Sequence, residues 1–218
     1  MNIAPSPVPD ALLLIAPGCP HCPAMLQALN VLLKEGVIGR LETVNVAAHP
    51  ERAAALGVKT VPWTRIGPFE LEGPVPPADL RRLAQQADSI EGMAQYFLEM
   101  LTTGRRHKVE QMARREPSRL QALVRLLEDS ETSMAVRLGI GAVLEELQGS
   151  GVAEAMVPGL GALSAHPDPR TRADACHFLS LIGGPSVIPY LRARLDDEDR
   201  EVREIVAETL AELPGLTQ

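Results

Sequence analysis

The sequence predicts two regions of different fold class, an α/β domain over residues 1–88 and an all-α region of repeated helices over residues 117–218. Three observations predict this division. Apolar runs of strand length and helix length alternate over residues 10–88, whereas no strand pattern follows residue 89. The last part of the chain also repeats itself every 31 positions. A chain of 218 residues is long enough for two such domains.

The α/β domain is expected to follow the order β-α-β-α-β-β-α. Its first strand is a continuous apolar run that ends at Pro17-Gly18, and its second helix is closed by Gly57. The expected elements are strand 11–16, a helix from the cysteines to Gly36, strand 40–46, helix 50–56, strands 60–66 and 69–72, and a helix from Pro77.

The 31-residue period is clearest in two short segments, because residues 156–160 match residues 187–191. Each copy holds a proline, Pro158 or Pro189, that is expected in the first turn of a helix, where a missing N–H costs little. Each copy is followed by an aspartate that can cap a second helix. A helix pair with this period is typical of an α-solenoid.

The capping aspartates are Asp168 and Asp199, and each is followed four residues later by an arginine, Arg172 or Arg203. This pattern resembles HEAT-type repeats over roughly residues 117–214, which implies a HEAT-like all-α solenoid. Residues 89–116 are expected to be a helical connector or one imperfect repeat.

The net charge of −7 argues against general nucleic-acid binding through a basic surface. No apolar stretch approaches the ~20 residues of a membrane-spanning helix, and the first nine residues hold three prolines and no basic residue, unlike a signal peptide. We therefore expect a cytoplasmic protein without a membrane partner. Three cysteines do not suggest a disulfide framework, so the C-x-x-C pair indicates redox chemistry or metal binding.

The pair Cys19 and Cys22 lies between a predicted strand and a predicted helix, with Pro20 and His21 between the two cysteines. A thiol at a helix N-terminus faces free N–H groups and the positive end of the helix dipole, which stabilise a thiolate. Cys19 is therefore the expected nucleophile, and Cys22, one turn into the helix, is expected to resolve the mixed disulfide. Protonated His21 would stabilise the thiolate further.

The segment Thr60-Val61-Pro62 begins a predicted strand some 40 residues later. Together with Cys19-Pro20-His21-Cys22 it resembles the thioredoxin–glutaredoxin superfamily, and most closely the glutaredoxin-type protein disulfide oxidoreductases, over about residues 10–88. The resemblance implies a thioredoxin-like fold in which Pro62 is a cis-proline beside the cysteines. It also implies that Val61 pairs with the backbone of an extended substrate. Thr60 and Pro20 are expected to be further substrate-binding residues.

Two positions depart from thioredoxins proper. Gly18 occupies the place of a tryptophan before the first cysteine, and Leu13 occupies the place of a buried acid six residues before it. A standard thioredoxin is therefore not expected, and proton transfer at Cys22 must use another group or water.

These residues predict a thiol–disulfide oxidoreductase that exchanges its dithiol with the disulfide of a client protein chosen by the repeats. Its electrons come from a thiol reductant or a reductase, and it needs no bound cofactor. The direction of exchange stays open, since His21 favours an oxidant whereas the cytosolic redox poise favours a reductant. The alternative is a redox-inert adaptor in which both domains bind proteins. A zinc site is disfavoured because no second ligand pair exists at a suitable spacing.

Three further features have simpler interpretations. Cys176 falls at a small core position of a repeat and is expected to be buried and inert. Trp63 is expected to pack within its domain, although substrate contact is the alternative. Residues 105–125 hold seven basic and two acidic residues, which indicates either a solvated helix face or a patch that steers a partner.

Overall fold

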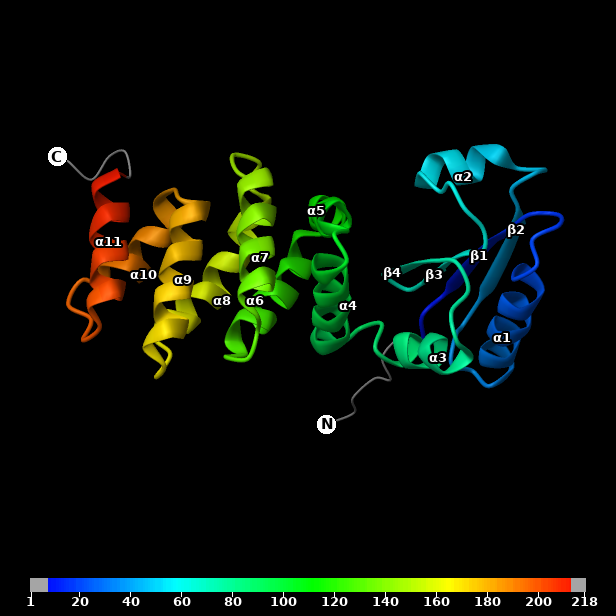
Figure 1. Ribbon diagram of the computed structural model, residues 1–218, viewed down its shortest axis with the longest axis horizontal. Coiled ribbons are helices and arrows are strands. Elements are labelled where there is room, and N and C mark those ends of the chain that lie inside the picture. The colour runs from blue at the N-terminus through cyan, green and yellow to red at the C-terminus, as the bar shows by residue number, and fades with distance from the viewer. Residues whose placement is uncertain (1–7, 213–218) are drawn as a thin grey trace. The chain divides into compact units, whose positions relative to one another are not determined.

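The computed structural model describes residues 8–212. The chain divides into two compact units, residues 1–92 and residues 93–218, whereas the sequence placed the first boundary at residue 88. Each unit is recognisable in Figure 1 by its secondary structure, since the labelled strands belong to the first unit and the second is helical.

The first unit has the predicted order β-α-β-α-β-β-α. Its elements are β1 (Ala11–Ile15), α1 (Cys22–Lys34), β2 (Leu41–Asn45), α2 (Pro50–Leu56), β3 (Trp63–Ile66), β4 (Phe69–Glu72) and α3 (Pro77–Gln85). The strands form one mixed sheet in the order β2-β1-β3-β4. β1 runs parallel to β2 and antiparallel to β3, and β3 runs antiparallel to β4. The parallel pair needs a crossover, which α1 provides.

The two faces of the sheet carry separate apolar clusters because side chains alternate along a strand. On one face, Leu13 and Ile66 pack with Met25 of α1 and Leu80 of α3. On the other, Leu12, Leu14, Val44 and Trp63 form a cluster against which residues of α2 pack. Trp63 is 2% exposed, so the prediction that it packs within the domain is confirmed.

β1 and β2 are shorter than predicted by one and two residues, and β3 is shorter by three. The sequence pattern predicted a strand over residues 60–66, but β3 begins at Trp63. Its first residue pairs with Leu14, and β1 ends one residue further on, at Ile15. Pro62 also has no backbone N–H with which to extend the ladder. Residues 60–62 therefore form a loop at the edge of the sheet.

Over residues 93–212 the structure describes helices and no strand. The helices are α4 (Ile90–Thr102), α5 (Arg106–Arg115), α6 (Gln121–Glu128), α7 (Met134–Glu146), α8 (Val157–Leu163), α9 (Pro169–Ile182), α10 (Ile188–Arg192) and α11 (Arg200–Glu212). Short 3₁₀ turns η1 (Pro117–Leu120), η2 (Val152–Met156) and η3 (Pro185–Val187) precede α6, α8 and α10. The longer helices α7, α9 and α11 lie side by side in Figure 1, and α8 and α10 pack against α9 and α11.

The helix ends follow the predicted pattern. Pro158 and Pro189 lie in the first turns of α8 and α10. The Asp168 carboxylate accepts a hydrogen bond from the Thr171 N–H at 3.0 Å at the start of α9. Asp199 accepts in the same way from the Val202 N–H at 3.3 Å at the start of α11. These carboxylates satisfy N–H groups that have no partner inside the helix.

Three arginines at equivalent positions, Arg137, Arg172 and Arg203, hold the turns between helices. Each guanidinium donates to carbonyl oxygens of the turn that precedes its own helix. The acceptors are those of Asp129 and Thr132 for Arg137, His166 and Pro167 for Arg172, and Asp197 and Glu198 for Arg203. Backbone oxygens that no helix satisfies thus gain donors from the following helix.

Arg172 also bridges to the next repeat. Its guanidinium donates to both carboxylate oxygens of Asp197, with distances of 2.8 Å from Nη2 and 3.0 Å from Nε. The side chains of Arg172 and Asp197 are only 5% and 3% exposed. Asp168, four residues before Arg172, caps α9, whereas Arg172 reaches across the repeat boundary.

Replacing the buried arginine should destabilise the helical unit. We expect Arg172→Met to lower the free energy of unfolding by about 3 kcal/mol, because buried Asp197 would lose its hydrogen-bonded guanidinium and keep only Arg194, 3.7 Å away, as a counter-charge. Urea unfolding followed by circular dichroism measures this change. Fluorescence of Trp63, the single tryptophan, monitors the first unit separately.

The matched control is Arg200→Met, which removes an exposed pair with Glu204 whose side chains are 82% and 55% exposed. We expect this change to cost less than about 1 kcal/mol. Equal effects of the two substitutions would contradict the importance assigned to the Arg172–Asp197 pair.

The same pair predicts a loss of stability in acid. Burial raises the pKa of the Asp197 carboxyl, but hydrogen bonds from Arg172 and the Asp199 N–H outweigh burial, so the pKa lies below its ordinary value of 3.8. A carboxyl with a lowered pKa stabilises the fold above its unfolded pKa, and this stabilisation disappears as the pH falls through the folded pKa. We expect the unfolding free energy to fall from about pH 5 downward, and less steeply in Asp197→Asn. Identical pH slopes for the two proteins would exclude Asp197 as the responsible group.

Candidate functional site

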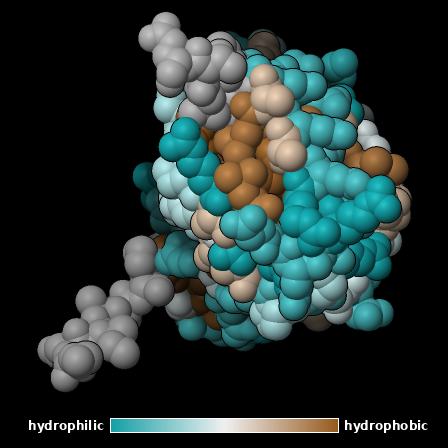
Figure 2. Space-filling model, turned by 90° about the vertical axis from the view of Figure 1, so that its left-hand side faces the viewer, coloured by the Kyte–Doolittle hydropathy of each residue, from teal (hydrophilic) through white to brown (hydrophobic). Residues whose placement is uncertain are grey.

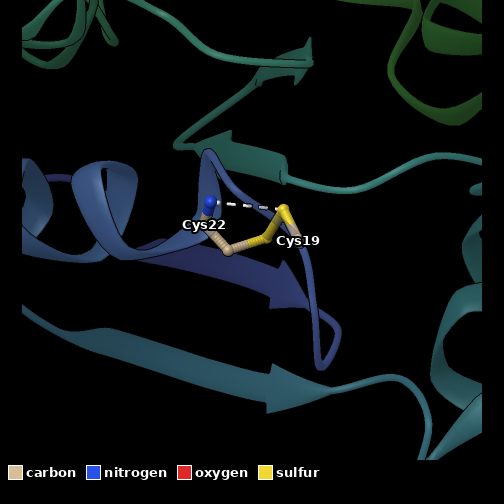
Figure 3. The surroundings of a disulfide bond; sticks show 2 residues. All are labelled: Cys19 and Cys22. Carbon is tan, nitrogen blue, oxygen red and sulfur yellow. Dashed lines mark hydrogen bonds between the residues drawn. A yellow bond between two sulfur atoms is a disulfide. The ribbon is translucent and has the colours of Figure 1, made fainter.

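Cys19 and Cys22 are joined by a disulfide whose Cα atoms lie 5.5 Å apart (Figure 3). Cys22 is the first residue of α1 and is 5% exposed. Cys19 lies in the preceding loop and is more exposed. A partner can therefore reach Cys19 more easily than Cys22.

The loop before α1 is shaped by its glycine and by hydrogen bonds to its cysteines. Gly18 has φ of 79°, a left-handed conformation that residues with a side chain rarely adopt. The Cys19 N–H donates to the Ala16 carbonyl at 3.3 Å. The Cys22 N–H donates to Cys19 Sγ at 3.2 Å, as the dashed line in Figure 3 shows. The first N–H of the helix thus points at the sulfur of Cys19.

The electrostatics of α1 favour negative charge on Cys19. The first turn holds no acidic residue, and the basic Lys34 lies in the last turn. Free N–H groups and the helix dipole stabilise an anion at a helix N-terminus, and a thiolate is such an anion. Once the disulfide is reduced, this end of α1 is therefore suited to hold Cys19 as a thiolate.

The remaining predicted site residues lie in two loops, the one that holds Cys19 and the one that precedes β3, which β1–β3 pairing brings to the same end of the sheet. Pro20 and His21 are exposed in the loop before α1. The Val61–Pro62 peptide bond is cis, which is the form that the resemblance implies. Pro62 directly precedes the Leu14–Trp63 pair, so it lies at the edge of the sheet where β1 ends. Thr60 is exposed in the same loop.

Val61 keeps its backbone available for a partner. Its side chain packs against the Trp63 cluster, and the neighbouring Pro62 carbonyl accepts from the Gly73 N–H at 2.9 Å. The Val61 N–H and carbonyl themselves make no hydrogen bond to another residue in the described part of the chain. An extended peptide can pair with free groups of this kind.

The loops at this edge of the sheet carry little charge. Strand register places four loops there, namely residues 16–21, 46–49, 57–62 and 73–76. Apart from the disulfide-bonded Cys19, their ionisable side chains are those of His21, His49 and Lys59. Glu72, the last residue of β4, adds one carboxylate beside them. Exposed prolines and alanines make up much of the remaining surface.

A polar residue that the sequence pattern did not single out lies behind the cysteines. Thr64 of β3 is 0% exposed, and its hydroxyl has no hydrogen-bond partner among the described residues. It pairs in register with Leu13. Only strand register reveals this neighbour, because the two residues lie far apart in the sequence.

The helical unit has a different surface. Basic residues of segment 105–125 form local ion pairs, including Arg106–Glu110, Arg119–Glu116 and Arg125–Glu128, which favours the interpretation as a solvated helix face. Met134 and Leu138 lie one turn apart on α7 and are 58% and 67% exposed. Figure 2 views the molecule from the side that α11 occupies in Figure 1, and a compact apolar patch there is surrounded by hydrophilic residues.

The described residues 8–212 hold neither a metal-binding cluster nor a membrane-spanning helix. No cluster of three or more His, Cys, Asp or Glu side chains is placed to hold a metal ion. None of these helices is both long and apolar enough to cross a membrane.

The third cysteine is expected to be inert. Cys176 in α9 is 0% exposed, and burial raises the pKa of its thiol to about 11. After reduction of the disulfide, we expect iodoacetamide at pH 8 to alkylate Cys19 first, Cys22 more slowly and Cys176 only after unfolding, because the thiolate is the reactive form. Peptide mapping by mass spectrometry measures the order. Early labelling of Cys176 in the folded protein would contradict this assignment.

Comparison with known families matches residues 120–211 to HEAT repeats. The match falls within the span of 117–214 that the sequence pattern indicated and does not extend to residues 1–119. No curated protein matches the chain. The helices from α6 to α11 thus form HEAT repeats, whose stacked helix pairs create extended surfaces for binding other proteins.

Proposed function

We propose that the first unit is a thioredoxin-like thiol–disulfide oxidoreductase and that the HEAT repeats bind its client protein. The observation that carries this proposal is the Cys19–Cys22 disulfide at the N-terminus of α1, at the same sheet edge as the free backbone of Val61. The β-α-β-α-β-β-α order and the mixed sheet support a thioredoxin-like fold.

In the reducing direction, the Cys19 thiolate attacks one sulfur of the client disulfide. A bond forms between Cys19 and that sulfur, and the second client sulfur leaves as a thiolate. Cys22 then loses its proton and attacks Cys19 Sγ, which closes the Cys19–Cys22 disulfide and releases the first client sulfur. Two electrons pass to the client, whose two thiolates take up two protons. A thiol reductant or a reductase restores the dithiol, and the reverse sequence oxidises a client dithiol.

The client segment should be extended and largely uncharged. Val61 offers an N–H and a carbonyl to a passing strand, which binds many sequences equally well. The surrounding loops offer apolar side chains and only three ionisable groups besides Cys19. Charged side chains beside the client disulfide would lose hydration there without gaining partners. Selection among clients then depends on the HEAT repeats.

The second candidate is a redox-inert adaptor. The match to HEAT repeats favours it, because such repeats bind proteins and carry out no redox chemistry. In an adaptor the first unit would bind a protein without exchanging disulfides. The two candidates differ in whether Cys19 ever becomes covalently linked to a partner.

A covalent trap tests both candidates in the full-length chain. Cys22→Ser removes the resolving thiol, so we expect Cys19 to accumulate in mixed disulfides with a small set of proteins. Non-reducing gels and mass spectrometry identify the partners and the peptides linked to Cys19, which should be poor in charged residues. The double variant Cys19→Ser/Cys22→Ser is the control and should trap none covalently. Partners that bind this double variant equally well, with no covalent product from Cys22→Ser, would establish the adaptor.

A further inference from the structure

The buried hydroxyl of Thr64 points to a role in the second half of the proposed exchange reaction. A buried polar group is normally hydrogen-bonded, so an unpartnered one requires an explanation. Thr64 is 0% exposed, and its Oγ1 lacks a partner among the described residues of the oxidised protein. A group that gains a partner only in the reduced protein would account for this.

The sheet register places Thr64 on the same side as the cysteine helix. Thr64 pairs with Leu13, and directly opposed residues of antiparallel strands point to the same face. That face is the one on which Leu13 packs with Met25 of α1. Met25 and the buried Cys22 lie on one side of α1, about one turn apart. Thr64 therefore lies in the core layer between the sheet and the helices α1 and α3, on the same side of the sheet as Cys22.

Other groups able to serve Cys22 are absent from this layer of the described structure. Leu13 and Leu71, the register partners of Thr64, are both apolar. α3 contributes Leu80 and Ala84 to the same cluster. The titratable groups of α1 and the loop before it are Cys19 and His21 at the surface and Lys34 in the last turn. Those of α3 form pairs, Asp79 with Arg82 and Arg81 with Glu35. Arg65, Glu70 and Glu72 of the strands point to the opposite face of the sheet.

We propose that the Thr64 hydroxyl donates a hydrogen bond to Cys22 Sγ, directly or through one water molecule, when the disulfide is open. This inference rests on the proposed oxidoreductase function. A thiolate accepts hydrogen bonds more strongly than a disulfide sulfur because it is charged. The bond therefore favours the form of Cys22 that attacks Cys19 Sγ in the mixed disulfide. The client sulfur leaves as a thiolate and takes the proton that Cys22 released.

A disulfide reagent that releases a coloured thiolate separates the two steps. With 5,5′-dithiobis(2-nitrobenzoate), attack by Cys19 releases the first coloured thiolate, and attack by Cys22 on the mixed disulfide releases the second. We expect Thr64→Val to slow the second release about tenfold and to raise its pH midpoint by about one unit, since one pKa unit is a tenfold change in thiolate. The first release should be unchanged.

Two further variants control the test. Thr64→Ser keeps the hydroxyl and should restore the second release. Thr43→Val makes the same substitution at an exposed strand position of the same unit, in β2, and should alter neither the second release nor its pH midpoint. Valine has the shape of threonine, so we expect Thr64→Val to fold, and Trp63 fluorescence checks this.

The outcomes distinguish failure of this inference from failure of the proposed function. A folded Thr64→Val protein with an unchanged second release and pH midpoint would overturn the role of Thr64 alone. The oxidoreductase function, and this inference with it, would be overturned if the reduced wild-type protein released no coloured thiolate. The same would follow if the Cys19→Ser variant released as much coloured thiolate as the wild-type protein.

Discussion

Four residues of β1 pair with four residues of β3, from Ala11 opposite Ile66 to Leu14 opposite Trp63. This ladder determines how the cysteine loop and the Val61–Pro62 segment lie relative to each other. It ends just where β1 turns into the cysteine loop and where the Val61–Pro62 segment enters β3, so two segments some 40 residues apart meet at one edge. A shift by one residue would send every side chain of β3 to the opposite face. Trp63 would then leave its cluster, and Thr64 would leave the sheet face that α1 and α3 cover.

The helical unit depends on a different kind of constraint, because its turns hold backbone carbonyls that no helix satisfies. Arg137, Arg172 and Arg203 supply donors to these carbonyls, and Arg172 also reaches Asp197 of the next repeat. One side chain thereby fixes a turn and a repeat boundary at once. Each repeat consequently depends on its neighbour, as expected for a stacked array whose units cannot bury their own apolar faces.

The two units offer different chemistry to other proteins. The edge that carries Cys19 is nearly free of charge and exposes a segment of unpaired backbone at Val61, which suits an extended, uncharged segment of many sequences. The HEAT repeats carry a dense set of surface ion pairs and a few exposed apolar residues such as Met134 and Leu138. Under the proposed function, chemistry that accepts many sequences is combined with a surface able to select one protein.

The sequence by itself determined the order of the strands and helices, the cysteine pair at a helix N-terminus and the 31-residue repeat, because these depend on local periodicity, caps and turn residues. Only the tertiary structure decided that β3 starts at Trp63, that Arg172 pairs with Asp197, and that Thr64 lies beside Leu13. These three facts depend on strand register and on contacts between repeats. Such contacts join residues distant in the chain, and local sequence patterns carry no information about them.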